Sequence, residues 1–227
     1  MRRALAILLL CLVPLAAGCG GKSGGSGKST SKPSLVGQNG GRGSGCKQVR
    51  APHAKGAGHE KKPKRALDAS KKWSLVISTN CGSFTVALDV SEAPHTTASL
   101  VALAKSGFFD GTAFHRIVPG FVIQGGDPTG TGQGGPGYST VDKPPAAARY
   151  TRGVVAMAKT QDEAPGTAGS QFFVVTGTDA GLPPDYAVVG RVVAGLDVVE
   201  RIGQLGDPST ERPTQPVVIS RVSVRRG

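Results

Sequence analysis

The sequence predicts a mainly β domain over residues 73–227, an antiparallel β-barrel that closes on itself and is capped by two α-helices. Two observations predict this class. Seven or eight short strand-like segments recur from Trp73 onward, and only two helix-like segments, far apart in the chain, interrupt them. Closure into a barrel leaves no bare strand edges, which is why many short strands favour it. Residues 1–72 have a different composition and divide into a leader and a tether.

The leader, residues 1–18, has the pattern of an export signal. Two arginines precede an apolar run from Ala4 to Ala17, which is short for a membrane span but suits a secretory signal peptide. Residues 15–19 read LAAGC and resemble a bacterial lipobox, which implies that Cys19 becomes a lipidated N-terminus. We therefore expect an exported protein, anchored by lipid to the outer face of the bacterial cell membrane. An ordinary signal peptide cut near Ala17 and an uncleaved anchor are the alternatives.

Residues 19–72 predict a disordered, basic tether. Residues 20–45 are mostly Gly, Ser and Lys, which cannot bury an apolar core. The tether holds 13 Lys and Arg against two acidic residues, whereas residues 73–227 hold 12 Lys and Arg against 13 Asp and Glu. Because the folded part is near neutral, we expect no nucleic-acid partner. The charge of the tether fits either adhesion to an anionic lipid or wall polymer, or a solvated spacer.

Two cysteines of the mature chain, Cys46 and Cys81, can form a disulfide in an exported protein. Such a bond would join the end of the tether to the first hairpin of the domain. The sequence contains no CxxC pair and no histidine near these cysteines, so we expect no metal. We also expect no cofactor, and a monomer.

The first elements of the domain follow from alternation and helix signals. Trp73–Thr79 predicts a strand, and a turn leads to a second strand over 84–90, in which apolar and polar residues alternate. Pro94 suits the first turn of a helix that Gly107 ends, and Ser91 is placed to cap it.

The remaining elements are short. Predicted strands cover 113–118, 121–124, 154–158, 171–176, 188–193 and 217–224, and a second helix covers 196–204. The Gly- and Pro-rich stretch from Asp127 to Thr151 predicts an ordered surface loop, because strands resume after it.

Three blocks of the domain resemble the cyclophilin family of peptidyl-prolyl isomerases: GFFDGT at 107–112, FHRIVPGFVIQGGD at 114–127 and GSQFFV at 169–174. Their order and spacing agree with the family over about 73–224. The resemblance implies an eight-stranded antiparallel barrel closed by two helices. It also implies an enzyme that accelerates rotation about X–Pro bonds, here in proline-containing segments of exported proteins as they fold.

The resemblance further implies roles for individual residues. Arg116 matches the catalytic arginine, a permanently charged donor for the twisted amide. The residues implied to contact substrate are His115, Phe121, Val122, Gln124, Ala158, Lys159, Gln171, Phe173, Leu182 and Tyr186. Three of them, Val122, Lys159 and Tyr186, differ from the residues of the best-known members, which implies an altered peptide preference.

Two other functions are compatible with the sequence. One is a non-catalytic module on the cell surface that captures proline-containing peptides, and the other is an adhesion protein whose basic tether is the active part. Hydrolysis is disfavoured, because no Ser or Cys nucleophile with a matching partner accompanies His115.

Overall fold

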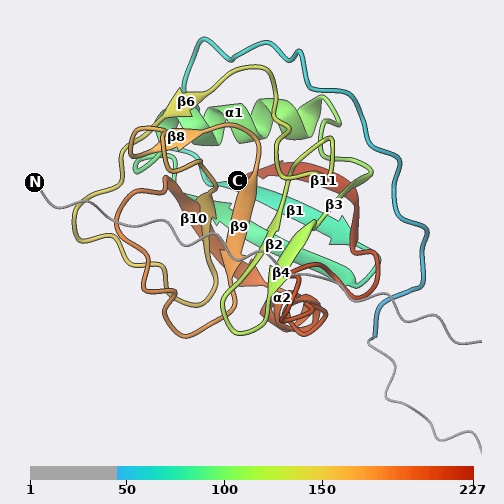
Figure 1. Ribbon diagram of the computed structural model, residues 1–227. Helices are drawn as coiled ribbons and strands as arrows, with labels where there is room; N and C mark the ends of the chain where they lie inside the picture. The colour runs from blue at the N-terminus through green and yellow to red at the C-terminus, as the bar shows by residue number, and fades with distance from the viewer. Residues whose placement is uncertain (1–44) are drawn as a thin grey trace, which may run out of the picture. The chain divides into compact units, whose positions relative to one another are not determined.

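The computed structural model of the protein describes residues 45–227 (Figure 1). The predicted leader, Cys19 and the first part of the tether lie outside the described residues. Within 45–227, no helix is both long enough and apolar enough to cross a bilayer.

The described chain forms eleven strands and two helices. Their bounds are β1 Trp73–Thr79, β2 Gly82–Leu88, α1 Pro94–Lys105, β3 Thr112–Ala113, β4 Arg116–Val118, β5 Val122–Gly125, β6 Thr140–Val141, β7 Val154–Met157, β8 Thr167–Ala168, β9 Phe172–Val175, β10 Val188–Ala194, α2 Leu196–Gly203 and β11 Val218–Arg226. β6 and β8 form a separate two-stranded ribbon, in which β6 lies inside the predicted surface loop and β8 follows β7.

The other nine strands form one antiparallel sheet in the order β3-β11-β1-β2-β10-β7-β9-β5-β4. Its two edge strands, β3 and β4, are separated in the chain by only Phe114 and His115, so the sheet curls until its edges meet (Figure 1). The predicted mainly β fold with two helices is confirmed. The count is nine instead of eight because the predicted strand at 113–118 is split, as its pairing passes from β11 to β5.

The start of α1 differs from the prediction. Ala93 occupies the N-cap position and makes no capping bond with its side chain, so the expectation for Ser91 is wrong. Instead, the carboxylate of Asp142 accepts the backbone N–H of Thr96 at 2.6 Å, across 46 residues of sequence. An acceptor at this end satisfies one of the N–H groups that a helix leaves unpaired.

The sheet carries apolar side chains on both faces. Residues opposite each other on neighbouring strands share a face, and successive residues alternate between faces. Ile117, Ile123 and Val174 therefore lie in the inner core, while Val122 and Phe173 belong to a second apolar cluster on the other face. That outer cluster supplies the floor of the site described below.

Residues 45–72, which we call the strap, have no regular secondary structure but are bound along the outside of the domain (Figure 1, blue to cyan). A disulfide joins Cys46 to Cys81, and the indole N–H of Trp73 donates to the carbonyl of Asp68 at 3.0 Å. The predicted disorder is therefore wrong for this part of the tether. The disulfide joins the residues that the sequence offered for it, whereas the backbone bonds left no signal in the few apolar side chains of the strap.

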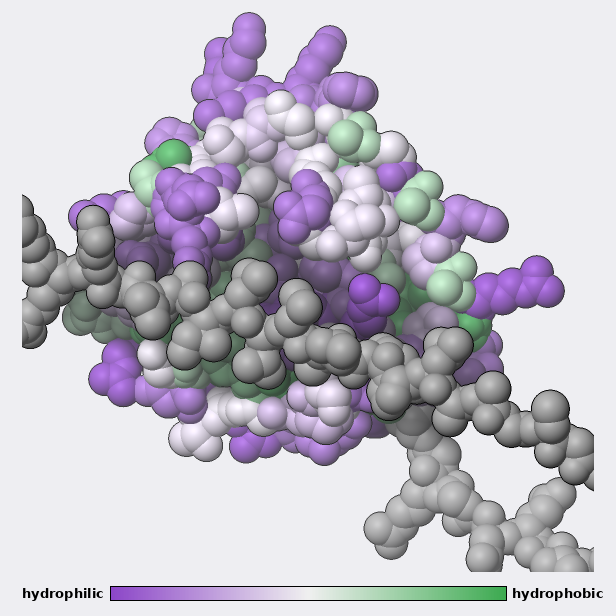
Figure 2. Space-filling view, in the orientation of Figure 1, coloured by the Kyte–Doolittle hydropathy of each residue, from purple (hydrophilic) through white to green (hydrophobic). Residues whose placement is uncertain are grey.

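The strap keeps its charged groups in solvent. It holds nine Lys and Arg against Glu60 and Asp68, and most of these side chains are exposed. Figure 2 shows strongly hydrophilic side chains projecting from the top and right edge of the molecule, where the strap runs in Figure 1.

Candidate active site

Strand register brings distant residues into one row. Arg116 on β4 lies opposite Gln124 on β5, Gln124 lies opposite Phe173 on β9, and Phe173 lies opposite Ala156 on β7. Because opposite residues share a face, the arginine, the glutamine and the phenylalanine all point to the outer side of the sheet.

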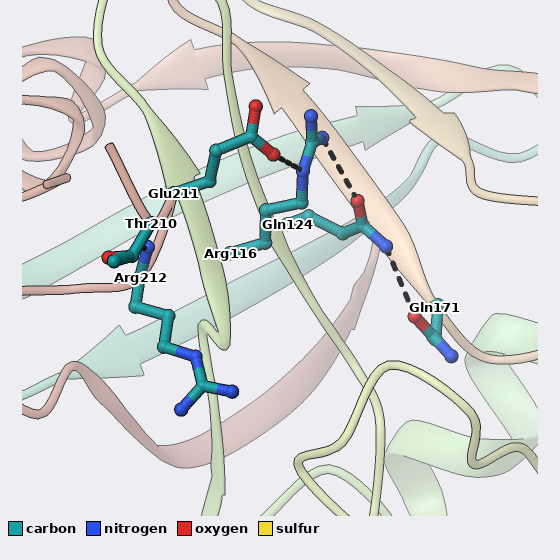
Figure 3. A network of polar contacts seen from close by, with 6 residues as sticks. All are labelled: Arg116, Gln124, Gln171, Thr210, Glu211 and Arg212. Carbon is teal, nitrogen blue, oxygen red and sulfur yellow. Dashed lines mark hydrogen bonds and ion pairs between the residues drawn. The ribbon is translucent and has the colours of Figure 1, made fainter. Parts of the chain in front are cut away.

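A chain of polar contacts runs through Arg116 (Figure 3). Its Nε donates to Glu211 Oε2 at 2.6 Å, and its Nη1 makes a long contact of 3.5 Å with Gln124 Oε1. Gln124 Nε2 donates in turn to Gln171 Oε1 at 3.1 Å. Within residues 45–227, no acceptor pairs with Arg116 Nη2, which leaves that donor for a ligand.

Glu211 is absent from the residues predicted from the sequence. It lies in the turn before Pro213, and among residues 45–227 it is the one non-glycine residue with a positive φ, 57°. Its carbonyl accepts the N–H of Ile117 at 2.8 Å, so the turn is fastened to β4 beside Arg116. Figure 3 shows its carboxylate directed at Arg116, while the side chain of Arg212 extends away. Its separation of 95 residues from Arg116 left no local signal for this pair.

A cavity of about 330 Å³ opens beside Arg116, within the usual size range of small-ligand pockets. Its lining consists of Arg116, Phe121, Val122, Gln124, Ala158, Lys159, Phe173, Leu182 and Tyr186. All nine are residues predicted from the sequence, and they come from three strands, β4, β5 and β9, and three loops. Six of the lining residues are apolar or aromatic, and Arg116, Gln124 and Lys159 supply the polar groups.

An aromatic cluster supports the cavity from behind. Tyr150, Phe173 and Tyr186 pack with ring centroids 5.6 to 6.2 Å apart. The fully buried Tyr150 donates its hydroxyl to the carbonyl of Tyr186 at 2.7 Å and accepts the N–H of Tyr186 at 3.0 Å. Burial raises the pKa of Tyr150, so the hydroxyl stays neutral and able to donate. Tyr150 lies near the end of a long irregular loop without alternation or a motif, so the sequence did not predict its role.

The rim of the cavity carries a cation that faces an aromatic ring. Lys159 Nζ lies 5.6 Å from the ring centroid of Tyr186 and donates to the carbonyls of Thr160 and Glu163, each at 3.1 Å. This side chain is therefore held over the rim and does not fill the cavity.

The two remaining predicted residues lie outside the lining of this cavity. Gln171 borders an adjacent cavity of about 450 Å³, which shares Gln124, Ala158 and Lys159 with the first. His115 lies against Gly132, and its buried Nδ1 has no hydrogen-bond partner among the described residues. His115 is thus next to Gly132, a residue that lines the second cavity, and its predicted place at the pocket rim stays a prediction.

In residues 45–227, no group of three or more His, Cys, Asp or Glu side chains is arranged to hold a metal ion. What the site offers is an apolar floor, a fixed cationic donor and neutral amide groups.

Known proteins are similar to this chain in sequence and in fold. The family model described as "Cyclophilin type peptidyl-prolyl cis-trans isomerase/CLD" matches residues 74–224. Peptidyl-prolyl cis-trans isomerase ppi1 of Schizosaccharomyces pombe is 39% identical over 150 residues, covering 64% of this chain and 95% of the relative. Peptidyl-prolyl cis-trans isomerase A of Mycobacterium tuberculosis is 39% identical over 169 residues, covering 66% and 91%.

Solved structures agree with these matches. A cyclophilin-type peptidyl-prolyl cis-trans isomerase of Cryptosporidium parvum superposes with a TM-score of 0.63 at 30% identity, covering 68% of this chain and 98% of its own. A structure from the same organism, determined in the presence of the dipeptide Ala-Pro, gives a TM-score of 0.62 at 31% identity, covering 67% and 98%. With the family matched over residues 74–224 and the barrel and its cavity in place, the chain belongs to the cyclophilin-type peptidyl-prolyl cis-trans isomerases.

Proposed function

We propose that the cavity beside Arg116 holds the proline ring of an X–Pro segment and that Arg116 donates to the amide as it rotates. The observation that carries this proposal is the position of Arg116. Its guanidinium is held by Glu211 and Gln124 at the edge of an apolar cavity, with Nη2 left for a ligand. The Cryptosporidium parvum structure determined with Ala-Pro supports a ligand of this size.

The chemistry follows from the amide bond. Resonance gives the C–N bond partial double-bond character and a rotational barrier of about 18–20 kcal/mol. In the twisted state that character is lost and the nitrogen becomes a hydrogen-bond acceptor. A donor aimed at this nitrogen stabilises the twisted state more than the planar one, so it accelerates rotation. The floor formed by Val122 and Phe173 excludes water, which otherwise favours the planar, charge-separated form.

Isomerisation of a proline peptide, followed by exchange NMR, tests this assignment. We expect the full chain to accelerate exchange and Arg116→Ala to lose about 10²-fold or more of that rate. Arg212→Ala is the matched control, since this arginine lies in the same turn as Glu211 but extends away from Arg116 (Figure 3). Wild-type exchange at the uncatalysed rate, with peptide shifts still perturbed, would indicate the non-catalytic binding module. Equally fast exchange in the wild type and Arg116→Ala would overturn the role given to Arg116.

We also propose that the protein acts outside the cytosol, tethered by lipid on Cys19, on exported proteins as they fold. The leader sequence supports this, and so does the Cys46–Cys81 disulfide, because such bonds persist in oxidising compartments. Detergent phase partitioning of the full chain tests the anchor. We expect the wild type and Cys11→Ser in the detergent phase and Cys19→Ser in the aqueous phase. Recovery of the wild type in the aqueous phase would indicate an ordinary secreted protein.

A further inference from the structure

We propose that the strap is a positioning element of the active site, which fixes the loop of the second cavity and thereby tunes acceptance of the residues beside proline. The inference rests on the proposed function. The family match begins at residue 74, so the strap lies outside the family domain. Its contacts with the site are therefore a feature of this chain, added to the shared fold.

Main-chain hydrogen bonds hold the strap to the loop at 127–139. The N–H groups of Lys55, Gly58 and Glu60 donate to the carbonyls of Pro128, Gly135 and Pro136, at 2.8, 3.0 and 2.9 Å. Lys62 Nζ adds a bond of 2.8 Å to the carbonyl of Ser139. The strap thus contacts the loop at four points between residues 128 and 139.

Two glycines make this approach possible. A Cβ added to Gly58 would lie 2.8 Å from the carbonyl oxygen of Gly135 and 2.9 Å from both Pro136 Cα and Phe108 Cε2. Conversely, a Cβ on Gly137 would lie 2.5 Å from the carbonyl oxygen of Gly58. Such distances are too short for a real side chain, so strap and loop interlock only because neither position has one. Gly56, two residues earlier, has open space around it.

The loop leads directly to the site. Gln171 Nε2 donates to the carbonyls of Gly132 and Gly134, each at 2.9 Å, and Gln171 Oε1 accepts from Gln124, which contacts Arg116. Residues 132–139 also form one wall of the second cavity. Because the two cavities share Gln124, Ala158 and Lys159, a peptide with proline in the first extends neighbouring residues into the second.

The strap is held at other points that keep it in place against the loop. Its N-terminal end carries the disulfide from Cys46 to Cys81. Lys55 Nζ donates to the carbonyls of Phe108 and Asp110, at 3.1 and 2.5 Å. A displacement of the loop would therefore require the strap to give up several bonds together.

The test compares Gly58→Ala with Gly56→Ala in the full chain, on two substrates measured by exchange NMR. Ala-Pro reaches only the first cavity, and a pentapeptide with central proline reaches both. We expect Gly58→Ala to lower kcat/KM for the pentapeptide by about three- to tenfold, mainly through KM, and to change Ala-Pro by less than about twofold. Gly56→Ala should leave both substrates unchanged. Equal losses on both substrates, or no loss, would overturn the proposal.

A second pair covers the case in which Gly58→Ala does not fold. Lys62→Met removes the donor to Ser139 from an exposed position, and Lys61→Met is its neighbouring control. Lys62→Met should lower kcat/KM for the pentapeptide about twofold, again with Ala-Pro unaffected. Equal behaviour of Lys62→Met and Lys61→Met would overturn the proposal.

Hydrogen exchange of the amides at positions 55, 58 and 60, which donate to the loop carbonyls, measures how firmly the strap is held without relying on catalysis. Faster exchange in Gly58→Ala than in Gly56→Ala is expected, and equal exchange would overturn the role of the strap whatever the enzyme does. A wild type inactive on both peptides, with exchange altered as expected, would instead overturn the assignment of the isomerase site.

Discussion

Arg116 carries a long side chain with considerable rotamer freedom, about 2 kcal/mol of which would be lost in holding one direction. Glu211 limits that freedom through a charge-assisted bond of 2.6 Å to Nε, the guanidinium nitrogen nearest the main chain. The side chains of Arg116 and Glu211 are 34% and 46% exposed, so solvent screens the pair and its contribution to folding is small. The ion pair instead orients the guanidinium of Arg116, because it leaves the two terminal nitrogens directed toward Gln124 and the cavity.

Replacing Glu211 should therefore affect turnover more than stability. We expect Glu211→Ala to lower kcat about three- to tenfold with little change in KM, and Glu211→Gln, which keeps an acceptor, to lose less. The free energy of unfolding should change by less than about 1 kcal/mol. Peptide exchange and urea titration measure the two effects. An unchanged kcat in Glu211→Ala would show that Gln124 alone orients the arginine.

His115 predicts a pH dependence of stability. Burial, together with the charge of Arg116, lowers its pKa below the ordinary 6.5 despite the attraction of Asp127. Below pH 6.5 this histidine is therefore protonated more in the unfolded chain than in the folded chain, so the free energy of unfolding falls as the pH decreases. The expected slope from this group is at most about 1.4 kcal/mol per pH unit.

Urea unfolding from pH 7 to 5 measures that slope. His115→Gln should flatten it, whereas His53→Gln, at an exposed position of the strap, should keep it. The same slope in wild type and His115→Gln would contradict the assignment.

At the scale of elements, the disulfide fixes the strap to the hairpin formed by β1 and β2. Cys46 and Cys81 are 35 residues apart, and closing a loop of this length in the unfolded chain corresponds to about 2–4 kcal/mol. We expect the double variant Cys46→Ser, Cys81→Ser to lose stability of this order in urea unfolding. Wild type with its disulfide reduced should match it. A loss below about 0.5 kcal/mol would mean that the unfolded chain gains little freedom when the bond is absent.

Elements were predictable where the pattern is local. The bounds of β1 agree with the prediction, and a strand at 113–118 was expected but is split, because its two ends pair with different strands. The cap on α1 comes from Asp142, and backbone bonds to the loop at 127–139 hold the strap. Each of these depends on a partner far along the chain, which no window of sequence contains.

The active site, too, was predictable from the sequence only where the family resemblance marks the residues. Five of the nine lining residues of the first cavity lie in the sequence blocks that resemble the family, and the family resemblance placed the other four from their positions between and after those blocks. Glu211 and Tyr150 lie in a turn and at the end of an irregular loop, where neither alternation nor a motif marks them. Their roles come from closure of the barrel, which sets a carboxylate against Arg116 and a hydroxyl against Tyr186.

For the whole molecule, β11 is the strand on which closure depends. It lies between β3 and β1 in the sheet, and its register joins Trp73 to Arg226. A chain ending at Val217 should therefore lose cooperative unfolding, because both neighbours of β11 would be left with an unpaired edge. A chain ending at Val224 loses only two of these pairs and should still fold. Far-UV circular dichroism with urea titration distinguishes them, and cooperative unfolding of the shorter chain would contradict this view.

The pairing of β1 with β11 also sets an order in time. β1 begins at Trp73, and its partner is made of residues 218–226, so this pairing cannot form until those residues have been synthesised, about 150 residues after β1. Until then the barrel cannot close, although the apolar strand β9, Phe172–Val175, has already been synthesised. Pairings between such distant segments form slowly, and the exposed strands are prone to aggregate meanwhile. Synthesis on the ribosome is therefore the stage at which this isomerase is most exposed to aggregation.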